Sequence, residues 1–137
     1  MENIEKIMDM LDWHMSPEIQ SKGIELARNM ETIIQFIQPL TPRHHKNVWE
    51  NCAIIIARKS DDKIKPYLTE LLEWLQDMNW PGAFCILNRL QKYSDNNSLR
   101  DAVRRSIEKA RNYNDAVWEN NLYLLSDFIN KRDAERV

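Results

Sequence analysis

Apolar residues recur at intervals of three and four along most of this sequence, which is the spacing of one face of an α-helix. The strongest such stripe is Leu68, Leu71, Leu72, Leu75 and Met78. The chain holds only two glycines, and its five prolines mostly stand where helical segments would begin. A chain of this kind favours short connections between helices over strands and hairpins. We therefore expect an all-α fold.

Two positions carry a clear helix-start signal. Ser16-Pro17 and Thr41-Pro42 each place a hydroxyl that can cap free N–H groups directly before a proline that fits the first helical turn. Polar residues at 60–62, 94–98 and 112–115 separate further apolar stripes. The sequence thus predicts eight short helices, at about residues 4–13, 17–30, 32–38, 42–59, 66–78, 81–90, 99–111 and 116–130.

The length of 137 residues suits one domain with its own core. We expect this domain to cover residues 1–130, because the tail at residues 131–137 has no apolar face and should fray. Trp49, Trp74 and Trp118 lie on or beside apolar stripes, which predicts packing inside the core. Cys52 and Cys85 lie inside apolar runs without CxxC spacing, so we expect two buried, reduced thiols.

A short internal repeat suggests how the helices are arranged. Val48-Trp49-Glu50-Asn51 recurs as Val117-Trp118-Glu119-Asn120, each time in the second helix of a predicted pair. Stacked helical repeats require matching residues at matching places. We therefore predict a right-handed α-solenoid of about four HEAT-like antiparallel helix pairs, with a compact helical bundle as the alternative.

One stretch of the sequence carries a family resemblance. It runs from Lys65-Pro66-Tyr67-Leu68 to Asp77-Met78-Asn79-Trp80-Pro81-Gly82-Ala83, and the residues from Asp77 onward are its most specific part. With this stretch the chain resembles HEAT-like helical-repeat proteins, and more narrowly a small DUF5071-like bacterial family of unknown function. The resemblance implies an α-solenoid and a protein-binding role, as an immunity protein of a toxin system. It implies no catalytic residue.

The leading functional hypothesis follows from that resemblance. We expect the surface formed by the second helix of each pair to bind a protein partner, specifically the domain of a toxin, and to block it. The expected contact residues are Glu50, Asn51, Glu119 and Asn120, with Trp80 as an aromatic anchor. Trp80 stands at a turn between two helices, so the alternative is that it plugs the gap between them.

Nucleic-acid binding is the second hypothesis, because charge is distributed unevenly along the chain. Residues 1–31 hold seven acids against three bases, whereas residues 89–111 hold seven bases against three acids. The predicted helix at 99–111 could contact phosphates through its basic side chains. The net charge of −2 favours a solvated outer face for this helix instead. Its basic residues are Arg100, Arg104, Arg105, Lys109 and Arg111.

Enzymatic and metal sites find little support in the sequence. The adjacent residues His44 and His45 would point about 100° apart on a helix, so they could not jointly hold one metal ion. Phosphate-binding glycine loops and nucleophile elbows do not occur. We expect no catalytic residue, no metal and no cofactor. The chain also shows no signal peptide and no apolar run that could cross a bilayer, which predicts a cytoplasmic location away from membranes.

Overall fold

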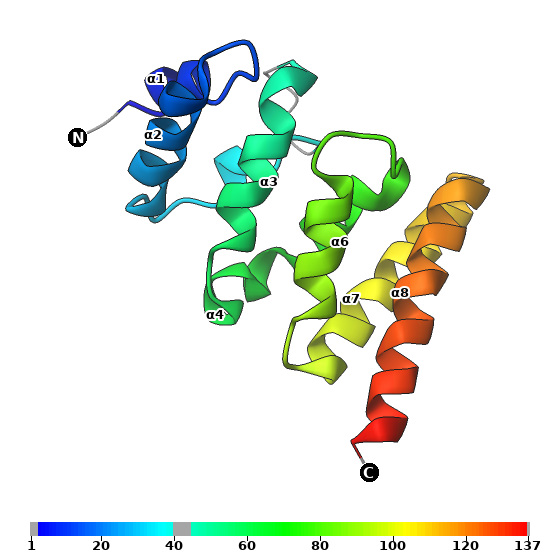
Figure 1. Ribbon diagram of the computed structural model, residues 1–137. Coiled ribbons are helices and arrows are strands. Elements are labelled where there is room, and N and C mark those ends of the chain that lie inside the picture. Colours follow the sequence, from blue (N-terminus) through cyan, green and yellow to red (C-terminus); the bar gives the residue numbers. More distant parts are fainter. Residues whose placement is uncertain (1–2, 40–44, 137) are drawn as a thin grey trace.

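The computed structural model describes residues 3–39 and 45–136, and these residues are all-α (Figure 1). Within them the chain forms eight α-helices, four short 3-10 helices and no strand. The prediction of an all-α fold is confirmed. The α-helices are α1 (Ile4–Met10), α2 (Pro17–Arg28), α3 (Trp49–Ala57), α4 (Asp61–Ile64), α5 (Leu68–Leu72), α6 (Ala83–Gln91), α7 (Asn96–Asn112) and α8 (Ala116–Glu135). The 3-10 helices are η1 (Ile34–Phe36), η2 (Lys46–Val48), η3 (Lys65–Tyr67) and η4 (Glu73–Gln76).

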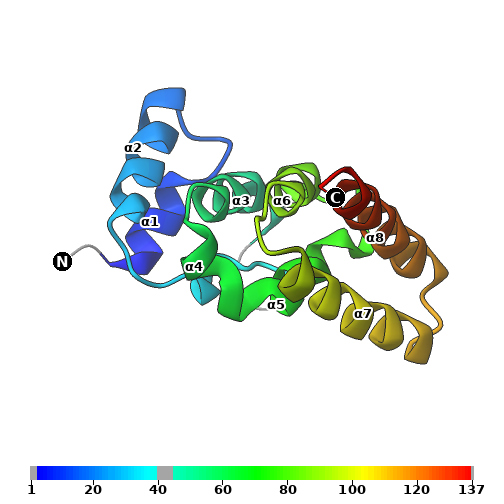
Figure 2. The ribbon, with the colours of Figure 1, turned by 90° about the horizontal axis from the view of Figure 1, so that it is seen from below.

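The helices form two layers. Figure 1 shows α2, α3, α6 and α8 side by side in one row, and Figure 2 shows α4, α5 and α7 in a second row against them. Contacts follow the chain through this array: α1 packs on α2, α2 on α3, α3 on α6 and α6 on α8, while α5 and α8 both pack on α7. The second helices of the predicted pairs therefore lie in one row. The HEAT-like solenoid stays a prediction.

The predicted helix starts agree with the structure where it describes them. Ser16 Oγ accepts a hydrogen bond from Ile19 N at 3.3 Å, and Pro17 occupies the first turn of α2. Asp95 caps α7 and Asp115 caps α8 in the same way. The Thr41-Pro42 start lies outside the described residues.

Two predicted helices are shorter or more broken than expected. The helix predicted at 32–38 is reduced to η1, a single 3-10 turn that no side chain caps. The helix predicted at 66–78 divides into the end of η3, then α5 and η4, because Pro66 and the 3-10 turn that follows Leu72 interrupt the regular α-helical hydrogen bonding. Its apolar stripe is buried all the same, with Leu71, Leu72 and Leu75 completely inaccessible to solvent.

The core contains the three tryptophans expected there. Trp49, Trp74 and Trp118 are 5%, 0% and 1% exposed. Cys52 is buried and unpaired, and burial raises the pKa of its thiol. Cys85 is only half-buried, which corrects the expectation that both thiols lie fully in the core.

The C-terminal tail is helical at residues 131–135, the segment for which a frayed end was predicted. Helix α8 continues to Glu135. Arg132 donates hydrogen bonds to the carbonyl oxygens of Gln91 at 2.6 Å and Tyr93 at 2.8 Å, and Asp133 accepts one from Asn96 Nδ2 at 2.6 Å. These polar contacts hold the last turns, whereas the prediction rested only on the missing apolar face of the tail.

Candidate functional site

The loop between η4 and α6 contains the specific Asp77–Gly82 run of the sequence. Asp77 organises its first half, because its carboxylate accepts a hydrogen bond from Asn79 N at 2.8 Å and its carbonyl accepts one from Trp80 N at 3.0 Å. Trp74 Nε1 donates to the carbonyl oxygen of Pro81 at 2.8 Å. The loop is thus fixed by hydrogen bonds to its own backbone.

Gly82 ties this loop to α3. Its φ of 89° lies in the left-handed region that glycine adopts readily. An added Cβ would stand 2.8 Å from Ala53 Cβ and 3.0 Å from the carbonyl oxygen of Trp49, so the loop and α3 touch at this point. The Gly82 N–H donates to Glu50 Oε2 at 2.5 Å.

An aromatic cluster forms where the loop meets α3. The rings of Trp49 and Trp80 stand edge to face, with centroids 5.3 Å apart and an interplanar angle of 88°. Trp49 makes a second edge-to-face contact with Trp74 at 6.1 Å. The ammonium of Lys46 lies 5.6 Å from the Trp49 centroid and 5.4 Å from the Trp80 centroid. Two indole rings therefore share one cation.

Trp80 combines the two roles left open by the sequence. Its contact with Trp49 closes the space between the loop and α3, yet the side chain is only half-buried. The buried Trp49 Nε1, in contrast, has no hydrogen-bond partner among the residues that the structure describes. Glu50 lies on α3, and its carboxylate reaches the loop that carries Trp80. There it accepts the N–H of Gly82, two residues beyond Trp80.

Asn51 is not a surface residue. It is 9% exposed and donates hydrogen bonds to the carbonyl oxygen of Leu11 at 2.7 Å and to Gln20 Oε1 at 2.9 Å. Its amide therefore holds α3 against α2 and the end of α1. The expectation that Asn51 contacts a partner is corrected, because a buried amide with these bonds is not available to one.

The second copy of the repeat has a different environment. Asn120, the counterpart of Asn51, is exposed on α8. Glu119 is half-buried and accepts hydrogen bonds from Arg111 Nε at 2.9 Å and Tyr123 Oη at 3.0 Å. These bonds from Arg111 and Tyr123 lower the pKa of the Glu119 carboxyl although partial burial opposes them. Only the tryptophan of the repeat is buried in both copies.

Large apolar side chains are exposed on α6 and α8. Phe84 is 63% exposed, Val117 62%, Leu124 66% and Phe128 36%. The three residues of α8 are seven and four positions apart, which places them along one side of the helix. Phe128 contacts Arg132, which reaches the carbonyl oxygen of Gln91 at the end of α6, so this side of α8 borders α6. We call these four residues the α6/α8 apolar patch.

Sequence patterns did not predict this patch. A usable signal was present, because α8 has more apolar residues than one helix side can bury. Helix α8 ends the row and has α6 as its one neighbour there (Figure 1).

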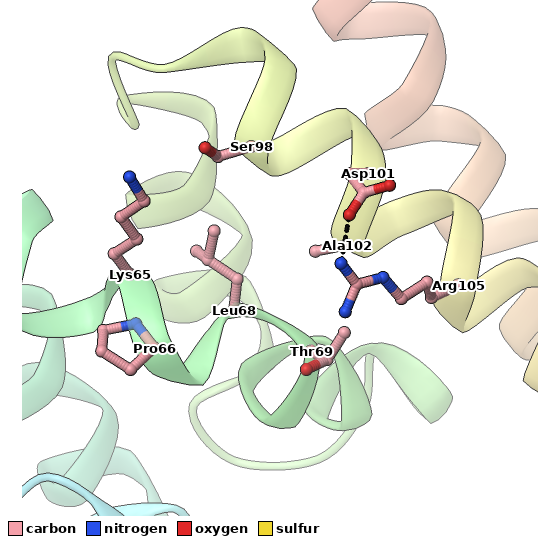
Figure 3. A pocket seen from close by; sticks show the side chains of 8 residues that line it. All are labelled: Lys65, Pro66, Leu68, Thr69, Ser98, Asp101, Ala102 and Arg105. Carbon is pink, nitrogen blue, oxygen red and sulfur yellow. Dashed lines mark hydrogen bonds and ion pairs between the residues drawn. The ribbon is translucent and has the colours of Figure 1, made fainter.

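The basic residues of α7 are divided between two adjoining grooves and a third, separate one. Arg105 lines a groove of about 210 Å³ between η3, α5 and α7, together with Lys65 and Thr69 (Figure 3). Arg105 and Lys109 also line an adjoining groove of about 230 Å³. The other three, Arg100, Arg104 and Arg111, line a groove of about 420 Å³ between α7 and α8.

Each of these basic residues has an acidic partner. Arg104 and Arg105 share Asp101, and their hydrogen bonds lower the pKa of that carboxyl. The remaining pairs are Arg100 with Asp133, Lys109 with Glu73 and Arg111 with Glu119. The structure thus divides and partly neutralises the basic face that the sequence suggested.

The family follows from a match over the larger part of the chain. The family model described as a domain of unknown function, DUF5071, matches residues 40–134. The chain belongs to the DUF5071 family. No curated protein and no solved structure matches it.

The DUF5071 region includes every residue proposed for binding. It contains α3 to α7 and nearly all of α8, the loop at 77–82, the α6/α8 apolar patch and the basic residues of α7. Helices α1 and α2 lie outside it and join it through the buried hydrogen bonds of Asn51.

The described part of the chain, 3–39 and 45–136, shows no group of three or more His, Cys, Asp or Glu side chains placed to hold a metal ion. His45 is exposed there, and His44 lies outside the described residues. No described helix is both long and apolar enough to cross a bilayer.

Proposed function

We propose that this DUF5071 protein is a protein-binding helical domain and that its partner covers the outer side of α6 and α8. The observation that carries the proposal is the α6/α8 apolar patch, in which Phe84, Val117 and Leu124 are each more than 60% exposed. Exposed apolar groups of this size mark contact surfaces when they gather on neighbouring elements, because covering them removes apolar area from water.

The surroundings of the patch suit the edge of an interface. Asn120, Asp127 and Lys131 are exposed on α8 beside the apolar residues, and Asn88 is exposed on α6. An apolar centre with a polar border is the usual composition of a protein contact. The predicted contact residue Asn120 belongs to this border, whereas Glu50 and Trp80 belong to the separate site at the loop.

We propose further that the partner is a toxin domain and that binding blocks it inside the cytoplasm of the producing cell. The support is the immunity role that the resemblance to HEAT-like helical-repeat proteins implies, together with the row of second helices, which offers one continuous layer of helices for a large partner (Figure 1). Inhibition would be steric, because a domain bound across α6 and α8 prevents other molecules from reaching the covered surface of the toxin.

The first experiment tests the patch. Tagged wild-type protein and the variants Phe84→Asp and Leu124→Asp would be used to isolate partners from the native host. We expect a specific protein with the wild type and its loss with both variants. The matched control is Ile34→Asp, because Ile34 is an exposed apolar residue, 42% accessible, that lies on η1 away from α6 and α8. Retention of the partner by both patch variants would refute the proposal.

A second experiment tests the toxin role. The isolated partner would be expressed in a sensitive cell with and without the chain, and growth would be measured. Growth arrest that the wild type relieves and Leu124→Asp does not relieve is the expected result. A partner without toxicity would remove the immunity role and leave protein binding in place.

Nucleic-acid binding is the alternative function, and the groove between α7 and α8 is the observation that favours it. Arg100, Arg104 and Arg111 line one wall of this groove, which could follow a phosphate backbone. Asp101, Asp133 and Glu119 pair with these arginines, so fewer counterions would be released on binding than three free cations would give. The protein-binding proposal therefore ranks first.

A further inference from the structure

The cation between Trp49 and Trp80 raises the question of what that place is built to hold. Lys46 Nζ lies within 6 Å of both ring centroids, at 5.6 Å and 5.4 Å. Indole has the strongest attraction for cations among the aromatic side chains, because its face carries a negative electrostatic potential. Two indoles that stand edge to face around one ammonium form two walls of a cation site.

A carboxylate stands next to these walls. Glu50 follows Lys46 by four positions across η2 and the start of α3, and the Gly82 N–H fixes its carboxylate beside the Trp80 loop. Trp80 is held by the Asp77 carbonyl, and Trp49 is held between Trp74 and Trp80. The walls and the carboxylate are therefore positioned by contacts other than those of Lys46.

Lys46 itself is weakly attached. Its residue is exposed, and in the described part of the chain it makes no ion pair. The contacts of its ammonium within the described ranges are those with the two aromatic faces. A flexible lysine side chain held in this way can be displaced, since another ammonium group would make the same contacts.

We propose that Trp49 and Trp80 form a binding site for an alkylammonium group, which Lys46 occupies in the free protein and which a ligand ammonium takes over on binding. The ligand group is a lysine ammonium or a methylated ammonium. A methylated ammonium gains more, because it is less strongly hydrated and loses less on leaving water.

This inference goes beyond the proposed function and does not use the α6/α8 apolar patch. A protein partner that inserts a lysine at Trp80 would engage both surfaces. Because the ammonium site can be tested with small molecules alone, its failure would leave the patch proposal untouched, and the loss of the patch proposal would leave the ammonium site untouched.

The experiment is an NMR titration of the full chain, with the indole N–H signals of Trp49 and Trp80 as the readout. Choline is the probe, and sodium chloride at equal concentration controls for ionic strength. The second control is 3,3-dimethyl-1-butanol, which has the shape of choline without its charge. We expect choline, and neither control, to shift the two indole signals. Lys46→Ala should tighten choline binding about tenfold, as expected when a competing cation–π contact is removed.

Three variants complete the test. Trp80→Leu keeps an apolar side chain in the loop and should abolish the effect of choline. Lys65→Ala removes another exposed lysine, which lines the groove between η3, α5 and α7. This variant should leave choline affinity unchanged. Titration of Lys46→Ala with acetyl-lysine methylamide and with its trimethylated form would identify which ammonium the site prefers. Equal affinities indicate an unmodified lysine of a protein. A strong preference for the trimethylated form indicates a quaternary ammonium.

Two results would overturn the inference. One is the absence of any indole shift in Lys46→Ala at millimolar choline while the amide spectrum shows a folded protein. The other is an equal shift with choline and its neutral analogue, because that would show an apolar contact without a role for the charge.

Discussion

Gly82 donates its backbone N–H to the carboxylate of Glu50, 32 positions earlier in the chain, and so connects the start of α6 to α3. The contact depends on the left-handed backbone of Gly82 and on the lack of a side chain there. Because α3 and α6 are neighbours in the row, this one bond also positions the aromatic site.

Replacing Gly82 should therefore destabilise the protein. Gly82→Ala forces a φ of 89° on a residue with a Cβ and places that Cβ against Ala53 and the Trp49 carbonyl. We expect a loss of about 1–3 kcal/mol in the free energy of unfolding. Urea denaturation measures it, with Ser21→Ala on the exposed side of α2 as control. A loss within the error of the control would contradict the described contact.

Truncation of the central stripe should be more costly. Leu72 and Leu75 are both completely buried, so Leu72→Ala and Leu75→Ala should each lower the free energy of unfolding by about 2–5 kcal/mol. Leu124→Ala makes the same chemical change at a site that is 66% exposed and should cost no more than about 0.5 kcal/mol. Thermal or urea unfolding of the three variants measures these differences. Similar losses of unfolding free energy at all three sites would argue against the division into a buried core and an exposed patch.

The basic face of α7 separates the two functions. Reversal of Arg104 and Arg105 to glutamate should leave partner capture unchanged, because α7 lies in the layer opposite to the proposed contact surface (Figure 2). If the protein binds nucleic acid, the same change should abolish binding and reduce the salt slope by roughly one for each phosphate that the variant no longer neutralises. Fluorescence anisotropy with a duplex and a single strand, at two salt concentrations, measures this. Micromolar, salt-sensitive binding that disappears in the variant would make nucleic-acid binding the leading function.

Asp61 should make the stability of the protein depend on pH. Burial by itself would raise the pKa of this carboxyl, but hydrogen bonds from Arg89 and Ser94 outweigh it and hold the pKa below the ordinary value of 3.8. A lowered folded-state pKa contributes stability that is present above the unfolded pKa and is lost as the pH falls through the folded one.

The measurement for Asp61 is urea unfolding of the wild type and Asp61→Asn between pH 7 and pH 3. We expect the stability difference between them to stay constant down to about pH 5 and to shrink below about pH 4. Glu25→Gln is the control, since Glu25 forms an exposed pair with Arg28. A stability difference that does not change with pH would show that the pair contributes only through its hydrogen bonds.

Sequence patterns predicted the parts of this fold that depend on local chemistry. The stripe through Leu71 and Leu75 is buried, and Ser16 caps the helix that Pro17 begins. Those features depend on spacing and on residues that are adjacent in the chain. The same reasoning failed for Asn51 and Asn120, which share a sequence context but lie in different places. Asn51 lies between α3 and α2, whereas Asn120 is exposed on α8.

The candidate site was predicted only in part for a related reason. Trp80 and Glu50 were identified separately, one from the loop motif and one from the repeat, and no local pattern joined them. Their connection runs through Gly82, which approaches α3 only in the folded chain. Lys46 was not identified at all, because its contact with Trp80 is also made between distant segments. The helical turns at the end of α8 were not predicted because Arg132 and Asp133 are held by polar partners at the end of α6, in the α6–α7 connection and on α7.

The perpendicular rings of Trp49 and Trp80 have an optical consequence. Two indoles with centroids 5.3 Å apart are close enough for their electronic transitions to couple, and a rigid, chiral arrangement converts that coupling into a near-ultraviolet circular dichroism band. A cation that enters or leaves the space between them changes the local field at both chromophores. The circular dichroism band of these two rings therefore reports on the place where α3 meets the loop before α6. Occupancy of the cation site can be followed in solution through this band, with no dye attached.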